Sequence, residues 1–150
     1  MTAGIIVAVA ALALATAIGL LYRARNGALR PARTNGAAAG GPGSAVAAGP
    51  ELTTTDLGAP LGARATLVQF STAFCAPCRA TRQVLADVAA MTDGIAHVEI
   101  DAESHLDLVR RLDVRRTPTV LVLGPDGRIA RRASGQPRKA DVIAALGEVT

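Results

Sequence analysis

Two cysteines three residues apart are the side chains of this 150-residue chain best suited to chemistry. A disulfide between Cys75 and Cys78 would close so short a loop that it would constrain the unfolded chain very little. Two cysteines are also too few for the disulfide framework of a small secreted domain. The pair therefore indicates thiol–disulfide exchange or metal binding rather than a purely structural bond.

The segments on either side of the cysteines predict where the pair lies in the fold. The apolar run Ala65–Phe70 is typical of a buried central strand, and Arg79–Met91 carries apolar residues at helical spacing. At such a junction the free N–H groups and the positive end of the helix dipole favour a thiolate. We expect Cys75 to be the attacking sulfur and Cys78, one turn into the helix, to be the resolving sulfur.

The rest of the chain alternates between short strand-like and helical segments, which predicts an α/β fold with a mixed central sheet. The expected elements are strands at 95–100, 119–123 and 128–133, helices at 106–112 and 138–148, and an additional strand near 52–57. We expect the first three main strands to be parallel, since helices join them, and the last two to form an antiparallel hairpin.

Two motifs make this region similar to a known family. The run Phe74-Cys75-Ala76-Pro77-Cys78-Arg79 resembles the WCGPCK loop of thioredoxins. The run Arg116-Thr117-Pro118-Thr119-Val120 resembles the cis-proline segment of that family. The resemblance extends over most of residues 51–150, and Thr117 before the proline is closer to the TlpA-like branch.

The resemblance implies a thioredoxin fold and a thiol–disulfide oxidoreductase acting as a protein-disulfide reductase. Its partners would be client proteins with disulfides or thiols and an electron donor. It implies no cofactor other than the redox-active disulfide Cys75–Cys78, and we expect a monomer. Residues implied to dock the substrate are Thr117, Pro118, Phe74 and Arg116.

Some positions depart from the family pattern. Phe74 replaces a tryptophan and Ala76 replaces a glycine. Gln69 stands where the family has a buried aspartate, and His97 aligns with the lysine that partners it. Gln69 cannot titrate, so His97 or a bound water is the candidate proton acceptor for Cys78. Gln69 and His97 are thus the expected proton relay.

The first 22 residues are predicted to be a membrane helix. Ala3–Tyr22 has no charged residue and is long enough to cross a bilayer, with Tyr22 at the interface and Arg23 and Arg25 directly after it. The alternatives are a cleaved signal peptide, which would need a positive start that Met1–Gly4 lacks, or a buried helix. The positive-inside rule places the domain in the cytoplasm of a single-pass protein, and an extracytoplasmic domain is the alternative.

Composition divides the chain into a helix at 1–22, a flexible Gly/Ala/Pro/Arg linker at 23–50 and a thioredoxin-like domain at 51–150. All 12 acidic residues lie in that domain with 12 of the 16 basic ones, so its formal charge is zero. Its only aromatic residues are Phe70 and Phe74. A nucleic-acid-binding surface is therefore not expected.

Two other functions remain open from the sequence. Cys75, Cys78, His97 and His105 could together supply two sulfur and two nitrogen ligands to a metal, although the histidines lack zinc-finger spacing. The departures at Gln69 and Phe74 are compatible with a non-catalytic binding module of the same fold. Neither alternative explains a CxxC at a strand–helix junction as directly as disulfide exchange does, so no metal is expected.

Overall fold

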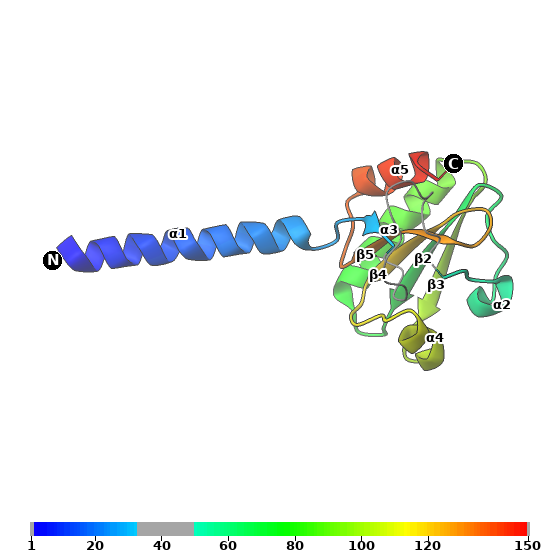
Figure 1. Cartoon of the computed structure of the whole chain (residues 1–150), viewed down its shortest axis with the longest axis horizontal. Helices are drawn as coiled ribbons and strands as arrows, with labels where there is room; N and C mark the ends of the chain where they lie inside the picture. Colours follow the sequence, from blue (N-terminus) through cyan, green and yellow to red (C-terminus); the bar gives the residue numbers. More distant parts are fainter. Residues whose placement is uncertain (1, 33–49, 150) are drawn as a thin grey trace, which may run out of the picture.

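The structure of the protein is a computed structural model that describes residues 2–32 and 50–149. Within these residues a five-stranded sheet has the order β1-β5-β4-β2-β3 (Figure 1). Its strands are β1 (Arg30–Pro31), β2 (Ala65–Ser71), β3 (Ile95–Asp101), β4 (Thr119–Leu123) and β5 (Ile129–Ser134). The helices are α1 (Thr2–Arg25), α2 (Thr54–Leu57), α3 (Ala76–Ala90), α4 (Leu106–Arg111) and α5 (Lys139–Gly147). The predicted mixed α/β sheet is confirmed.

The central strand β2 organises the core. All seven of its residues are buried, as expected for an apolar strand with neighbours on both sides. Alternate side chains point to opposite faces, so Leu67 belongs to one apolar cluster and Val68 and Phe70 to another. The first cluster lies under α3 and α5, and the second lies under α2 and α4.

One prediction about strand direction is wrong. β2 and β3 are parallel, but β4 runs antiparallel to β2. The length of the connecting helices explains the difference. The 15 residues of α3 span about 22 Å, which matches a seven-residue strand, whereas the six residues of α4 span only about 9 Å. The chain therefore stays at the end of the sheet where β3 finishes, and β4 starts there.

The strand predicted near Leu52–Leu57 is also wrong. This segment forms the short helix α2, whose N-cap residue Thr53 and N3 residue Asp56 make a reciprocal capping box. Leu52 and Leu57 are both buried in the cluster under α2 and α4. Only Glu51 makes an isolated bridge, to Arg128. Local side-chain capping thus decides the conformation here, which alternation of apolar residues does not reveal.

The N-terminal helix extends further than the composition suggested. α1 runs to Arg25, and Gly4–Tyr22 is apolar enough to cross a membrane, with a mean hydropathy of 2.6. Residues 26–32, which lie within the predicted linker, contact the sheet. The Gly27 N–H donates to the Ser134 carbonyl at 3.0 Å, and β1 pairs antiparallel with β5. The remaining linker positions 33–49 lie outside the described residues.

Candidate functional site

The two cysteines lie at the start of α3. Cys75 is the N-cap residue of the helix and is partly exposed, while Cys78 is only 2 % exposed. Their sulfur atoms form a disulfide, with Cα atoms 5.2 Å apart. The Cys78 N–H donates to the Cys75 carbonyl at 3.1 Å. The expected strand-to-helix position is therefore observed, with one sulfur reachable from solvent and the other covered.

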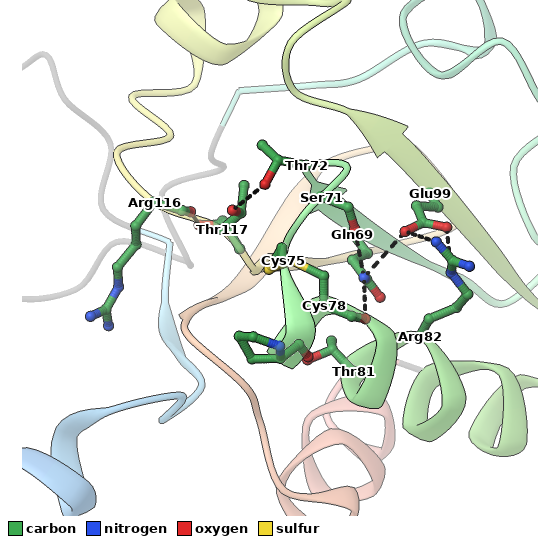
Figure 2. Close-up of a disulfide and its surroundings, with 12 residues drawn as sticks. Gln69, Ser71, Thr72, Cys75, Cys78, Thr81, Arg82, Glu99, Arg116 and Thr117 are labelled. Carbon is green, nitrogen blue, oxygen red and sulfur yellow. Dashed lines mark hydrogen bonds and ion pairs between the residues drawn. A yellow bond between two sulfur atoms is a disulfide. The ribbon is translucent and has the colours of Figure 1, made fainter.

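The cis-proline segment lies beside the cysteine loop. The Thr117–Pro118 peptide bond is cis, as the resemblance implied. The hydroxyls of Thr72 and Thr117 are 3.2 Å apart, and they join the loop before Cys75 to the loop before β4 (Figure 2). Thr117 is half-buried and Pro118 is buried. These two predicted docking residues are thus brought next to the disulfide loop.

The other two predicted docking residues behave differently from each other. Phe74 is 99 % exposed directly before Cys75, so it offers an apolar surface at the reactive sulfur. The Arg116 side chain points away from the disulfide in Figure 2 and donates to the carbonyl of Ser134. Phe74 therefore remains available to a partner, while Arg116 is engaged with the end of β5.

A polar network that begins at the buried Gln69 lies behind Cys78 (Figure 2). Gln69 is fully buried, and its Nε2 donates to the Cys78 carbonyl at 2.9 Å and to the Ser71 hydroxyl at 2.7 Å. The same Nε2 lies 3.5 Å from Oε1 of Glu99, which is directly opposite Gln69 in the parallel pair β2–β3. Gln69 thus holds the first turn of α3 and connects it to a carboxylate.

Glu99 is the charged group of this network. Burial alone would raise the pKa of Glu99, but hydrogen bonds from Arg82 and Ser71 lower it by more, so the pKa lies below its ordinary value. Arg82 contacts both carboxylate oxygens, at 2.6 and 2.8 Å. Glu99 is therefore ionised at neutral pH.

A pocket of about 450 Å³ brings these charges and the sulfur atoms together. It is lined by Ser71, Thr72, Ala73, Cys75, Cys78, Arg79, Arg82, Glu99 and Asp101. A molecule or side chain that enters this pocket would contact the Cys75–Cys78 disulfide and the Arg82–Glu99 ion pair. The arrangement suits proton exchange next to a sulfur atom.

A family model described as Thioredoxin matches residues 55–148, which is most of the chain. The chain belongs to the thioredoxin family. A search of curated proteins finds no match.

Solved structures share the fold of this thioredoxin domain. A mutant thioredoxin from Halobacterium salinarum NRC-1 is 23% identical, with a TM-score of 0.54 over 58% of this chain and 75% of that one. A chloroplastic thioredoxin z is 24% identical, with a TM-score of 0.53 over 58% of this chain and 79% of that one. A malarial protein is 18% identical, with a TM-score of 0.51 over 57% of this chain and 97% of that one.

His97 lies on the same strand of the thioredoxin domain as Glu99, but it is not among the described residues that line the pocket of the two sulfur atoms. It is half-buried on β3, opposite Leu67, and burial lowers the pKa of its imidazole. Its Nε2 is buried and has no hydrogen-bond partner among the described residues. Gln69 is thus in contact with Cys78, whereas His97 lies two residues before Glu99, the residue that faces Gln69.

The metal alternative would need Cys75, Cys78, His97 and His105 to converge. In the described part of the chain, no group of three or more His, Cys, Asp and Glu side chains is placed to hold a metal ion. The two sulfur atoms are bonded to each other, and the His105 ring lies 3.0 Å from the Asp101 carbonyl. The four residues are therefore not assembled into one site.

Glu99, Arg82 and Ser71 are the members of the site that sequence reasoning missed. Gln69 and Glu99 each have a place in a strand pattern, but only the register of β2 against β3 shows that they face each other. The spacing of His97 and Glu99 on one face of β3 was the available signal. It could not be used without knowing which face α3 covers.

Proposed function

We propose that this chain is a membrane-anchored thiol–disulfide oxidoreductase of the TlpA-like type, which exchanges disulfides with client proteins. The observation that carries the proposal is the disulfide between an accessible Cys75 at the start of α3 and a buried Cys78. A helix N-terminus stabilises the thiolate of the first cysteine, and the second is buried and bonded to the first.

The reaction takes two exchange steps. In the reduced protein, the Cys75 thiolate attacks one sulfur of a client disulfide, which forms a mixed disulfide and releases one client thiolate. The Cys78 thiolate then attacks the Cys75 sulfur, which releases the second client thiolate and leaves the Cys75–Cys78 disulfide. Two electrons pass to the client, and a dithiol electron donor restores the reduced state by the reverse exchange.

A proton must leave Cys78 before the second step. Gln69 cannot accept it, and His97 is not among the described residues that line the pocket of the two sulfur atoms. Glu99 lines the same pocket as both sulfur atoms and is ionised. We assign proton acceptance from Cys78 to Glu99, directly or through water, with Gln69 holding the first turn of α3 in place.

The anchor is the apolar helix α1. No part of its segment Gly4–Tyr22 is buried by the rest of the protein. A membrane-spanning helix would have this exposure, because lipid covers its apolar side chains. Arg23 and Arg25 follow the span, so the positive-inside rule places the thioredoxin domain in the cytoplasm. There, the glutathione and thioredoxin pools favour the reduced state, and the protein acts as a monomeric reductant.

Two cysteine variants test the exchange mechanism. The full chain in detergent micelles is incubated with insulin and a dithiol reductant, and insulin reduction is followed by turbidity. Cys75→Ser should lose all activity above background, while Cys78→Ser should accumulate a mixed disulfide that non-reducing electrophoresis detects. An active Cys75→Ser variant, or a parent protein without insulin reduction, would contradict the proposal and favour a binding module.

Reporter fusions at the C-terminus test the orientation. A cytoplasmic domain should give high activity of a reporter that works only in the cytoplasm and low activity of one that needs export. The opposite pattern would place the domain outside and would require electrons to cross the membrane.

A further inference from the structure

The end of the domain that carries the disulfide is also the end from which α1 leaves. The Ser134 carbonyl accepts hydrogen bonds from the Gly27 N–H, after α1, and from the Arg116 guanidinium, in the cis-proline loop. The Gly135 N–H donates to the Pro118 carbonyl at 2.7 Å. Ser134 and Gly135 therefore contact both the segment that follows α1 and the loop beside the active site. The segment that follows α1 is the pale blue ribbon near Arg116 in Figure 2.

This junction is closely packed. Gly27 and Gly135 have φ angles of 78° and 100°, which glycine adopts readily. A Cβ at Gly27 would lie 1.9 Å from the Gln136 carbonyl oxygen, and one at Gly135 would lie 2.2 Å from Oδ1 of Asn26. Together with the β1–β5 pairing, these contacts fix α1 to the domain instead of leaving it on a loose tether.

The junction also keeps the active-site end close to lipid. The five residue steps from Tyr22 to Gly27 rise only about 8 Å, which is about the thickness of one headgroup layer. Ser134 pairs with Thr119, and Thr119 pairs with Phe70 at the end of β2, so these three residues cross only about 10 Å of sheet. The cysteine loop begins directly after β2.

We propose that the junction holds the disulfide at the membrane surface, so that the redox partner is an integral membrane protein with its reactive cysteine pair at the lipid–water boundary. The proposal rests on the exchange function above. The exposed ring of Phe74 beside Cys75 would contact the apolar surroundings of such a pair. Cys75 can reach a partner cysteine pair at this depth while the Gly27–Ser134 hydrogen bond and the β1–β5 pairing stay intact.

Peptide substrates in nanodiscs test this placement. One synthetic transmembrane peptide carries a Cys-X-X-Cys disulfide two residues beyond its apolar span, and a second carries it on a helical spacer of 20 residues, about 30 Å higher. The full-length protein should reduce the boundary peptide at least about tenfold faster, because the effective concentration of a matched pair is high. Equal rates for the two peptides would overturn the proposal.

A pair of insertions isolates the junction. Ten Gly/Ser residues between Asn26 and Gly27 give the domain roughly 17 Å of free tether, and should remove the preference. The same ten residues inserted after Gly40 lie beyond β1 and should leave the preference intact. A preference that survives the first insertion would overturn the proposal.

Two further measurements separate this proposal from the exchange function. Soluble insulin should be reduced equally by the parent and both insertion variants, and loss of insulin reduction in the parent would instead contradict the exchange function. A fluorophore on Cys75 in Cys78→Ser should be quenched by nitroxide headgroup lipids in the parent background and not in the Asn26–Gly27 insertion. Absence of quenching in the parent background would overturn the placement even if exchange occurs.

Discussion

The carboxylate of Glu99 is the proposed proton acceptor beside the two sulfur atoms. It faces Gln69 across β2 and β3, accepts two contacts from Arg82 and shares the pocket with Cys75 and Cys78. Arg82 compensates most of its charge, so the carboxylate does not strongly disfavour a nearby thiolate. A base that stays ionised but is held by an arginine can receive a proton briefly and release it to water.

Glu99→Gln should slow the attack of Cys78 on the Cys75 mixed disulfide by about a hundredfold, the lower end of what a general base contributes. The step can be isolated by forming the Cys75 mixed disulfide with thionitrobenzoate and following release of the thiolate by absorbance. In the parent, the lowered pKa of Glu99 means that the base is available above its ordinary pKa of 4.5 and is lost as pH falls further.

The variant Glu103→Gln, which removes an exposed carboxylate, is the control and should release thionitrobenzoate at the parent rate. The Glu99→Gln rate should fall continuously as pH decreases, because Cys78 must then ionise unaided, whereas the parent rate should hold until pH falls below 4.5. If both variants kept the parent profile, proton acceptance by Glu99 would be wrong.

His97 should make the stability of the protein depend on pH. Burial lowers the pKa of His97 below its ordinary value of 6.5, so the unfolded chain binds a proton at a higher pH than the folded one. The contribution of His97 to the free energy of unfolding is fully present above pH 6.5, and it is lost as pH falls through the lowered pKa of the folded state. His97→Gln should reduce the change in melting temperature between pH 7.5 and about 5, measured by scanning calorimetry.

His105→Gln removes an exposed histidine and serves as the matched variant. It should keep the parent slope of melting temperature against pH. If His97→Gln also kept the parent slope, groups other than His97 would cause the acid sensitivity.

At the level of elements, helix α2 depends on a few polar contacts. The Thr53 N–H and hydroxyl both donate to the Asp56 carboxylate at 2.9 Å, and the Asp56 N–H donates back to the hydroxyl at 3.3 Å. The hydrogen bond from the Thr53 backbone, followed by that from Arg111, lowers the pKa of Asp56. The same carboxylate pairs with Arg111 of α4, so the cap also joins two helices on one face of the sheet.

Thr53→Ala should lower the free energy of unfolding by about 1 kcal/mol, the usual cost of removing an N-cap side chain. Denaturant unfolding of the full chain in micelles measures it, and Thr54→Ala, an exposed neighbour inside α2, is the control. An equal effect of the two substitutions would mean that the capping box contributes nothing.

The elements also show how far sequence reasoning reaches. The apolar run of β2 and the helical spacing in α3 predicted these two elements correctly, because the burial pattern of a strand or helix is written locally in its sequence. The direction of β4 and the helical α2 escaped prediction. Strand direction depends on the length of α4 against the sheet, and α2 depends on a cap that replaces the expected strand.

The same distinction applies to the site. Cys75, Cys78 and Pro118 lie in short motifs that can be recognised along the chain. Glu99 enters the site only through the register of β3 against β2, which depends on packing of distant segments. A sequence can therefore name the sulfur atoms of such a site more easily than the charges around them.

For the molecule as a whole, residues 26–32 pack on the thioredoxin domain although composition groups them with the linker. β1 is an edge strand, where a proline such as Pro31 is tolerated because its missing N–H interrupts no inner ladder. Leu29 packs against the cluster under α3 and α5, and Ala32 packs against the opposite cluster. Residues 26–32 thus contact the core on both faces of the sheet, although their sequence resembles a linker.

Two truncated proteins distinguish these boundaries. A fragment that begins at Asn26 should be more stable than one that begins at Pro50 by about 2 kcal/mol, from the half-buried Leu29 and the hydrogen bonds of Gly27 and Ala32. Urea unfolding of both fragments measures the difference. Leu29→Ala in the longer fragment should remove about half of it, which separates side-chain packing from backbone pairing. Equal stability of the two fragments would mean that β1 is a tether lying on the sheet and that the domain begins after residue 49.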